Sequence, residues 1–336
     1  MFIRCIALRY PKASFTICTS SQYASPFEKL PNIKNLGSAR RTIDRIYNKI
    51  SGKQVFKRHL EMTANATMHI GGSIFIEPDH FTMPKEYHSN PNLFVIGCNF
   101  GPYHTEMYRH FVFAKLQKAK DVCFRDRYSY DVFSEIEHVR VAPDVLFGYR
   151  EYPAVQEGCG VGISVINLDK RSDVKHMADT YYDVLAKIVD DCSQKKIPVK
   201  LFSFCTDEGD LQAIEEVMNR SETKNAQVCA YEGDIAAILA QINACEYIIA
   251  SRFHAMIIGW CLSKKVFPVV YSDKQVHVME DMAYQESYWD LRKETGFTAI
   301  ELLEHLHTIH SVDTRKYQLL SCHQFDGLDE YFKNTV

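Results

Sequence analysis

The 336-residue chain lacks the features that mark several large classes of protein. It has no run of about 18 consecutive apolar residues, so the sequence predicts no membrane-spanning helix. The first 21 residues contain neither a long apolar segment nor a small-residue cleavage site, so we expect no signal peptide. These absences predict a cytoplasmic protein, with peripheral association at the inner face of the cell membrane left open.

Neither sign of charge is in large excess, because the formal net charge is only −3. A broad nucleic-acid-binding face needs an excess of basic residues, so nucleic acid is not an expected partner. A local basic pocket remains compatible with this balance. Oligomeric state leaves no signal in the sequence.

The 11 cysteines include no Cys-x-x-Cys pair, although zinc sites usually show closely spaced ligand pairs. Several cysteines lie inside apolar runs, which indicates buried free thiols in a reducing compartment. The histidines at 305, 307 and 310 match no known ligand spacing, and we interpret them as helix-face residues. We expect no metal and no cofactor.

A Gly-x-Gly-x-x-Gly loop is absent as well, so a dinucleotide-binding fold of the usual kind is not supported. What the chain does show is short β-rich runs alternating with longer helical runs, which is typical of doubly wound parallel sheets. The length suits two domains. A segment with Pro153, Gly158 and Gly160 separates the two series. The sequence therefore predicts an α/β protein with Rossmann-like domains at 1–150 and 151–336.

The expected elements follow from these runs. Strands are predicted at 15–19, 64–70, 93–97, 121–124 and 139–141 in the first domain, and at 161–166, 199–204, 227–231, 247–250 and 266–271 in the second. Helices are predicted at 105–116, 130–136, 176–194, 209–220, 234–244, from 254 onward, and at 298–310.

The most informative segment is Ala-Ser-Arg-Phe-His-Ala at 250–255, between an apolar strand and an apolar helical run. It places Arg252 and His254 at the carboxyl end of a strand, where ligands bind in open α/β sheets. The start of a helix favours anions. With Lys274 close behind, the pattern indicates a small polyanion and a proton transfer. An ordinary salt bridge and a core histidine explain the same residues about equally well.

Other polar groups follow predicted strands. Gly71, Gly72 and Ser73 would let the backbone approach a ligand, but a tight turn at the strand end explains them better. Asp144 could accept hydrogen bonds from a sugar hydroxyl, although a turn-forming aspartate is equally compatible.

Arg125, Asp126 and Ser129 could bring a cation and a capping group to the same edge. A helix capped by Ser129, with a local Arg–Asp pair, accounts for them equally simply. The acidic segment 206–210 follows a strand, and we interpret it as the start of a helix, where acidic residues suit the helix dipole.

Taken in order, these pieces resemble the polysaccharide pyruvyl transferase family between about residues 60 and 275. The pieces are Gly-Gly-Ser-Ile-Phe at 71–75, Ile-Gly-Cys-Asn at 96–99 with Gly101-Pro102, Phe-Arg-Asp-x-x-Ser at 124–129, Ala-Pro-Asp at 142–144, Gly-Ile-Ser at 162–164, Ser-Arg-Phe-His-Ala at 251–255 and Pro-Val-Val-Tyr-x-x-Lys at 268–274. The Ser-Arg-x-His-Ala piece with its following Tyr-x-x-Lys is the most specific.

The resemblance implies a GT-B-like fold, with two Rossmann-like domains facing a central cleft. It implies transfer of pyruvate from phosphoenolpyruvate to a sugar of a surface polysaccharide or its lipid-linked precursor, giving a ketal. The first domain would be the acceptor side and the second the donor side, with the last helix packing back on the first. The expected partners are phosphoenolpyruvate and a sugar, oligosaccharide or lipid-linked saccharide.

On this interpretation His254 protonates the donor and Arg252 holds its carboxylate or phosphate, and both are catalytic. Lys274 would add a point charge, and Arg125 would reach the donor across the cleft. Asp126 or Asp144 would orient acceptor hydroxyls. The full set of expected substrate-binding residues is Lys274, Arg125, Asp126, Ser129, Gly71, Gly72, Ser73, Asn99, Asp144, Ser251 and Tyr271.

The N-terminus departs from the family pattern. Residues 1–4 resemble the middle of the family's first helix, so we expect the first strand and its glycine loop to be missing. Two alternatives stay open: a GT-B glycosyltransferase that uses a nucleotide sugar, and a non-catalytic carbohydrate-binding relative.

Overall fold

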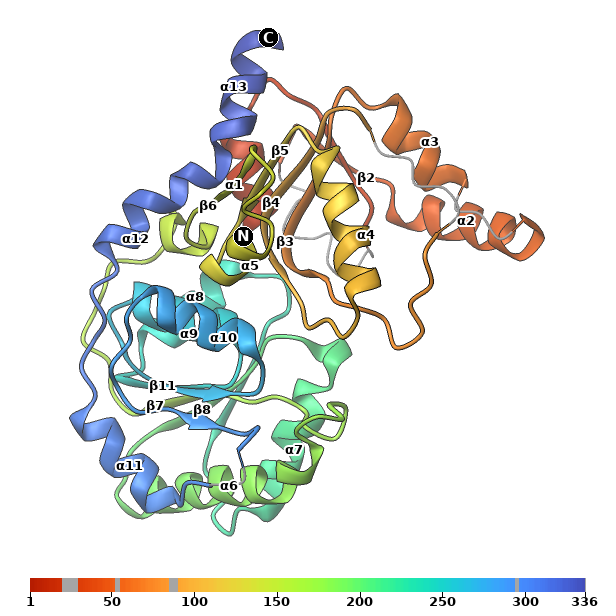
Figure 1. The fold of residues 1–336 in the computed structure, drawn as a ribbon. Coiled ribbons are helices and arrows are strands. Elements are labelled where there is room, and N and C mark those ends of the chain that lie inside the picture. The colour runs from red at the N-terminus through yellow and green to blue at the C-terminus, as the bar shows by residue number, and fades with distance from the viewer. Residues whose placement is uncertain (20–29, 52–54, 85–89, 294–295, 336) are drawn as a thin grey trace. The chain divides into compact units, whose positions relative to one another are not determined.

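A computed structural model describes residues 1–19, 30–51, 55–84, 90–293 and 296–335 (Figure 1). It contains two compact units. Unit 1 comprises Met1–Tyr149 and Tyr317–Val336, and unit 2 comprises Arg150–Lys316. Each unit is a parallel α/β structure, so the predicted class, α/β with two Rossmann-like halves, is confirmed. No helix in the described ranges is long and apolar enough to cross a membrane.

Unit 1 is built on a parallel four-stranded sheet with the order β3-β4-β5-β6. Its strands are β3 (Thr67–Phe75), β4 (Leu93–Phe100), β5 (Asp121–Phe124) and β6 (Val139–Val141), and a separate parallel pair joins β1 (Phe15–Ile17) to β2 (Ile33–Asn35). Its helical elements are α1 (Phe2–Arg9), α2 (Gly37–Ser51), α3 (Val55–Thr63), α4 (Glu106–Gln117), α5 (Arg127–Val132), η2 (Val145–Gly148), η5 (Ser321–Phe325) and α13 (Asp326–Thr335), with α12 (Arg315–Leu320) leading into the last two.

All eight residues of β4 are buried, because both faces of this strand are covered. Leu93 and Val95 pack on the same side as α4, whereas Phe94 and Ile96 pack on the side of α1 and α13. This alternation follows from the two-residue period of a strand. Unit 1 is therefore wound on both faces of its sheet.

The range expected for the second domain, 151–336, is too long at its end. Phe325 and Leu328 pack into the same core as Ile6, Phe94 and Ile96, so the last twenty residues belong to unit 1. The apolar face of this C-terminal segment covers one side of the unit 1 sheet. The resemblance to the family implied that the last helix packs back on the first domain, and Leu328 of that helix lies in this core.

Unit 2 is built on a parallel sheet with the order β12-β11-β10-β7-β8-β9. Its strands are β7 (Val161–Ser164), β8 (Val199–Ser203), β9 (Gln227–Ala230), β10 (Tyr247–Ala250), β11 (Lys265–Val270) and β12 (Trp289–Asp290). Helices α6 (Ala178–Gln194), α7 (Asp210–Arg220) and α11 (Ala299–Thr308) contribute to the core on one face. Helices α8 (Ile235–Asn243), α9 (Phe253–Cys261) and α10 (Asp273–Asp281) lie over the other face (Figure 1).

Counted along the chain from β7, the unit 2 order is 3-2-1-4-5-6, the arrangement of a dinucleotide-binding Rossmann sheet. The direction of winding reverses between β7 and β10, which are neighbours in the sheet. In such sheets ligands bind beyond the carboxyl ends of the strands at this reversal. The fold therefore points to the segments that follow Ser164 and Ala250.

Candidate active site

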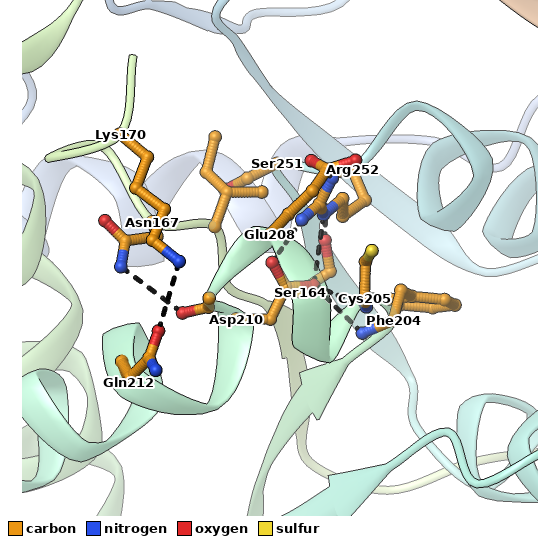
Figure 2. Close-up of polar contacts among 12 residues, drawn as sticks. Ser164, Asn167, Lys170, Phe204, Cys205, Glu208, Asp210, Gln212, Ser251 and Arg252 are labelled. Atoms are coloured by element: carbon orange, nitrogen blue, oxygen red, sulfur yellow. Dashed lines mark hydrogen bonds and ion pairs between the residues drawn. The ribbon is translucent and has the colours of Figure 1, made fainter. Parts of the chain in front are cut away.

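The segments after β7, β8 and β10 meet at the carboxyl edge of the unit 2 sheet (Figure 2). The segment after β11 joins them through the contact of Tyr271 with Arg171. Arg252 follows β10 and is the residue before α9. Its backbone N–H donates to Ser164 Oγ at 2.9 Å, and Ser164 ends β7. Ser251 is fully buried, and its hydroxyl lies 2.9 Å from that of Tyr181. These hydroxyl contacts fix the backbone at the point where Arg252 leaves the sheet.

Two carboxylates hold the Arg252 guanidinium (Figure 2). Nε and Nη2 donate to the two oxygens of Asp210, and Nη1 donates to Glu208 Oε2. Burial alone would lower the pKa of Arg252, but the two carboxylates outweigh it and raise the pKa above its ordinary value. The expected catalytic arginine is thus charged, oriented and already engaged by acidic partners.

Asp210 is anchored by the backbone. Its Oδ2 accepts hydrogen bonds from the N–H groups of Phe204 and Cys205 at 3.0 and 2.9 Å, and its side chain is wholly buried. Segment 206–210 was interpreted as an ordinary helix start, and this interpretation was incomplete. Asp210 begins α7, but it also aligns Arg252, which lies 42 residues later in the chain.

Sequence reasoning missed Arg171, which lies in the segment after β7. Its Nη2 donates to Glu208 Oε2 at 2.6 Å, so one carboxylate oxygen is shared by Arg171 and Arg252. The Arg171 guanidinium carbon also lies 4.4 Å from the centroid of the Tyr271 ring. The only available sequence signal was its position shortly after a strand at the point where the sheet reverses.

Tyr271 and Lys274 meet as expected at the end of β11. The Lys274 Nζ lies 5.2 Å from the centroid of the Tyr271 ring. Burial alone would raise the pKa of Tyr271, but the positive charges of Lys274, Arg171 and Arg252 outweigh it and hold the pKa below its ordinary value. The local field at this edge is therefore positive, even with two carboxylates close by.

His254 is the second residue of α9, and every other residue of that helix is buried. The His254 side chain is therefore the part of this helix that solvent reaches. The imidazole makes an edge contact with Phe253, at 5.3 Å between ring centroids. Arg252, the residue before α9, makes no side-chain capping hydrogen bond to the helix.

In unit 1, four of the expected residues form one connected network. Arg125 Nη2 donates to Asn99 Oδ1 at 2.6 Å, and Arg125 Nη1 donates to Asp144 Oδ2 at 3.1 Å. Ser73 Oγ donates to the same Asn99 oxygen at 3.0 Å. The side chains of Arg125 and Asp144 are 2% and 5% exposed, so this network ties together the ends of the unit 1 strands.

Asp126, and not Ser129, caps the helix that follows β5. Asp126 is the capping residue of α5, because its Oδ1 accepts from the Ser129 N–H at 2.8 Å. The Ser129 hydroxyl instead accepts from the Phe100 N–H at 2.8 Å and thereby joins α5 to β4. The Arg125 guanidinium forms an ion pair with the carboxylate of Asp144. A capping residue stands directly before the helix and has an extended backbone. Asp126 meets both conditions.

Gly71 and Gly72 do not form the predicted turn. Strand β3 continues through them to Phe75, and the register with β4 shifts between Gly72 and Phe75. Their φ angles are 60° and 73°, a region that glycine enters readily and other residues avoid. The register irregularity follows Gly72, and Ser73, the next residue, donates to Asn99.

A hollow of about 460 Å³ lies elsewhere in unit 1, lined by Asn92, Lys120, Asp121, Glu137, His138, Arg140, Gly327, Glu330, Tyr331 and Asn334. It lies at the amino ends of β4, β5 and β6, the edge opposite to Arg125 and Asn99. None of the predicted site residues lines it. Asp121 and Arg140 form an ion pair there, at 2.7 Å, which we interpret as structural.

The three C-terminal histidines make separate contacts. His305 packs against Phe267 and Phe297, His307 lies 3.4 Å from the Tyr247 hydroxyl, and His310 pairs with Glu286. Across the part of the chain that the structure describes, no group of three or more His, Cys, Asp or Glu side chains could hold a metal ion. All 11 cysteines are free thiols.

Comparison with models of known protein families gives a match that covers most of the chain. The model of a family described as polysaccharide pyruvyl transferase matches residues 8–273, further toward the N-terminus than the motifs alone reach. A search of curated proteins finds no significant match.

Solved structures with similarity to this chain include TarM, with 10% identity, a TM-score of 0.45, and coverage of 74% of this chain and 51% of TarM. Another is Anabaena HepE in complex with UDP and glucose, with 10% identity, a TM-score of 0.42, and coverage of 73% and 77%. The chain spans about half the length of TarM. The family match is the finding that bears on function.

Proposed function

Because the chain belongs to the polysaccharide pyruvyl transferase family, we propose that it transfers the pyruvyl group of phosphoenolpyruvate to a sugar. The acceptor would be part of a surface polysaccharide or its lipid-linked precursor, and the product a pyruvate ketal. The observation that carries the proposal is the cationic edge of unit 2, where Arg171, Arg252 and Lys274 gather beside Tyr271. His254 begins the helix that starts at the same edge.

The proposed reaction places three demands on the site. The methylene carbon of phosphoenolpyruvate takes a proton and becomes a methyl group, which makes the adjacent carbon electrophilic. Two sugar hydroxyls then add to that carbon and the phosphate leaves. Of the two hydroxyl protons, one balances the proton taken by the methylene and the other leaves with phosphate. The site must therefore supply an acid, hold two anionic groups and admit a diol.

The side chains of unit 2 suit the first two demands. His254 is exposed and can act as the acid, a role worth about 10²–10⁴-fold in rate. Arg252, Arg171 and Lys274 offer guanidinium and ammonium groups for a carboxylate and a phosphate. In this proposal Ser251 and Tyr271 support these groups, and unit 2 is the donor side.

Unit 1 is proposed as the acceptor side. The buried Arg125, Asn99, Asp144 and Ser73 are engaged with one another, so we assign them to shaping the carboxyl edge of the sheet. This replaces the direct roles first expected of Arg125 in donor binding and of Asp144 in orienting hydroxyls. A cytoplasmic location, where phosphoenolpyruvate is made, is part of the proposal.

The test is phosphate release from phosphoenolpyruvate, measured with and without a panel of galactosides, mannosides and hexosamine glycosides. We expect acceptor-dependent release that falls at least about 100-fold in His254→Ala. His310→Ala is the matched control, because His310 lies in the same unit and its side chain is 85% exposed. Full activity of the His254→Ala protein would contradict the proposed acid.

A nucleotide-sugar glycosyltransferase is the second candidate, because the strand order of unit 2 also suits a nucleotide at its reversal point. It predicts that a nucleoside diphosphate binds to the protein and that phosphoenolpyruvate does not. Equilibrium binding of the two ligands separates the candidates.

A further inference from the structure

Glu208 makes an unusual contact at the cationic edge of unit 2. Its Oε2 accepts a hydrogen bond from Arg171 Nη2 at 2.6 Å and another from Arg252 Nη1. Arg171 follows β7 and Arg252 follows β10, so two guanidinium groups from different segments converge on a single oxygen atom. Two such cations repel each other unless an anion lies between them. The point where they converge is therefore an anion seat, which is defined by Arg171 Nη2 and Arg252 Nη1.

The two acidic residues near this seat are held very differently. Asp210 is wholly buried and is bound by two backbone N–H groups as well as by Arg252. The Glu208 side chain is 51% exposed, and its two hydrogen bonds both go to the arginines of the seat. Glu208 ends the short turn η4 (Thr206–Glu208), and Gly209 follows it with a φ of 86°. Asp210 is thus part of the framework, whereas Glu208 can leave by rotating its side chain into solvent.

The seat does not depend on Glu208 for its shape. Arg171 is stacked on the ring of Tyr271. Asp210 accepts from Nε and Nη2 of Arg252, whereas the seat uses Nη1. Among the described residues, the buried side-chain atoms with no hydrogen-bond partner include Arg171 Nε, Asn167 Oδ1 and Ser272 Oγ. They come from the segments that follow β7 and β11 at this same edge. Buried polar atoms normally have partners, so these atoms are suited to meeting a bound molecule.

We propose that the Glu208 carboxylate occupies the seat of an oxyanion group of the donor, between Arg171 and Arg252, and is displaced when the donor binds. Arg171 becomes a donor-binding residue alongside Arg252. Lys274, which also lies against the Tyr271 ring, would take the donor's second anionic group. This inference rests on the proposed function for the identity of the donor, and on the geometry alone for the seat.

If Glu208 competes with the donor for the seat, removing the Glu208 charge should increase the affinity for the donor. An ion pair with a purely structural role would show no such gain in affinity. We expect Glu208→Gln to bind phosphoenolpyruvate about tenfold more tightly than the unaltered protein, since the ligand no longer competes with a carboxylate. We expect Arg171→Gln to bind it about tenfold more weakly. In the double variant the gain from Glu208→Gln should disappear, because the seat has lost one of its two cations.

The measurement is equilibrium binding by titration calorimetry, with phosphoenolpyruvate, inorganic phosphate and pyruvate as probes. Asp207→Asn is the matched control, because it removes one negative charge from the same turn. Arg171→Lys keeps the charge and is used if the glutamine variant does not fold. Tighter phosphate binding in Glu208→Gln would assign the seat to the phosphate group, and tighter pyruvate binding would assign it to the carboxylate.

The proposal is overturned if Glu208→Gln gains no more affinity than Asp207→Asn, or if its gain persists in the Arg171→Gln background. Failure of the proposed function gives a different result. In that case phosphate binding follows the expected pattern across the variants, while no acceptor supports release of phosphate from phosphoenolpyruvate. Conversely, acceptor-dependent transfer without the affinity pattern would retain the function and reject the seat.

Discussion

At the scale of single residues, Tyr271 reports most directly on the charge of the candidate site. Its pKa lies below the ordinary value because Lys274, Arg171 and Arg252 outweigh the effect of burial. An ordinary tyrosine has a pKa of about 10. We expect the phenolate of Tyr271 to form at a lower pH than that. Titration of the ultraviolet phenolate absorbance should show an early component that is missing in Tyr271→Phe.

Tyr284→Phe is the control for this titration, because burial raises the pKa of Tyr284 and its loss should leave the early component unchanged. Adding phosphoenolpyruvate should move the early component to higher pH, since a bound anion offsets the nearby cations.

The effect of the lowered pKa of Tyr271 on stability has a defined sign. A lowered pKa makes the folded state more stable as pH rises from the folded toward the unfolded value, with no contribution at neutral pH. An unchanged titration in Tyr271→Phe would refute the cationic cluster.

The residue scale also shows what a motif can and cannot predict. Arg252 and His254 were identified because a local pattern of strand, polar turn and helix placed them at a strand end. Arg171 was not, since the segment around it carries no motif, and its importance arises only from the contacts with Glu208 and Tyr271. The partners of Arg252 were likewise hidden, because an acidic helix start looks the same whether or not a distant arginine reaches it.

At the scale of elements, Asp190 of α6 fixes the segment that follows α7. Its carboxylate accepts hydrogen bonds from the Ser221 and Thr223 hydroxyls at 2.7 and 2.8 Å, and from the backbone N–H groups of Thr223 and Glu222. Burial alone would raise the pKa of Asp190, but these hydrogen bonds outweigh it and lower the pKa. We expect Asp190→Asn to reduce the free energy of unfolding by about 2 kcal/mol at neutral pH.

The pH dependence of this effect has a defined sign. Because the folded-state pKa of Asp190 is lowered, its stabilisation is complete above about pH 4 and is lost as pH falls through the folded value. The difference between Asp190→Asn and the unaltered protein should therefore shrink in acid. Denaturant unfolding at a series of pH values measures it. Asp191→Asn is the control, since Asp191 pairs only with an exposed lysine, Lys187, in the described contacts. A difference that grows in acid would contradict the assignment.

Element boundaries were predictable where burial is uniform and not where backbone geometry decides. Strand β5 has the predicted bounds, 121–124, and all four of its residues are buried. Strand β4 begins as predicted at Leu93 but continues to Phe100, past the expected end at 97. Strand β3 runs past its expected end, because Gly71 and Gly72 stay within the strand at positive φ and the register with β4 shifts only after Gly72. Helix α5 begins earlier than expected because Asp126 caps it.

At the scale of the whole molecule, the C-terminal segment completes unit 1. Leu328 is fully buried among Ile6, Phe94 and Ile96, all of which lie more than 200 residues earlier in the chain. We expect Leu328→Ala to destabilise unit 1 by about 2–5 kcal/mol, because it leaves a cavity in that core. Hydrogen exchange, read by mass spectrometry, should show faster exchange in β4 and α1 than in the unaltered protein.

Leu302→Ala is the matched change for unit 2, because Leu302 is fully buried in the core of that unit. It should speed exchange in α6 and β7 and leave β4 unaffected. Equal acceleration of both units by Leu328→Ala would show that residues 317–336 do not belong to unit 1 alone.

The sequence by itself determined the α/β class, the two Rossmann-like halves and the placement of Arg252, His254, Tyr271 and Lys274 at strand ends. These features depend on patterns within about twenty residues, because hydrophobic periodicity and turn chemistry act locally. The order of the motifs along the chain was also sufficient to indicate the family that the family model then matched.

Only the tertiary structure decided which strand ends are neighbours. Strands β8 and β10 flank β7, so Glu208 and Asp210 can reach Arg252 across it. The same holds for Arg125 with Asp144 in unit 1. The physical reason is that strand order and buried ion pairs are set by which surfaces pack together. That choice depends on the whole chain and leaves no local trace in the sequence.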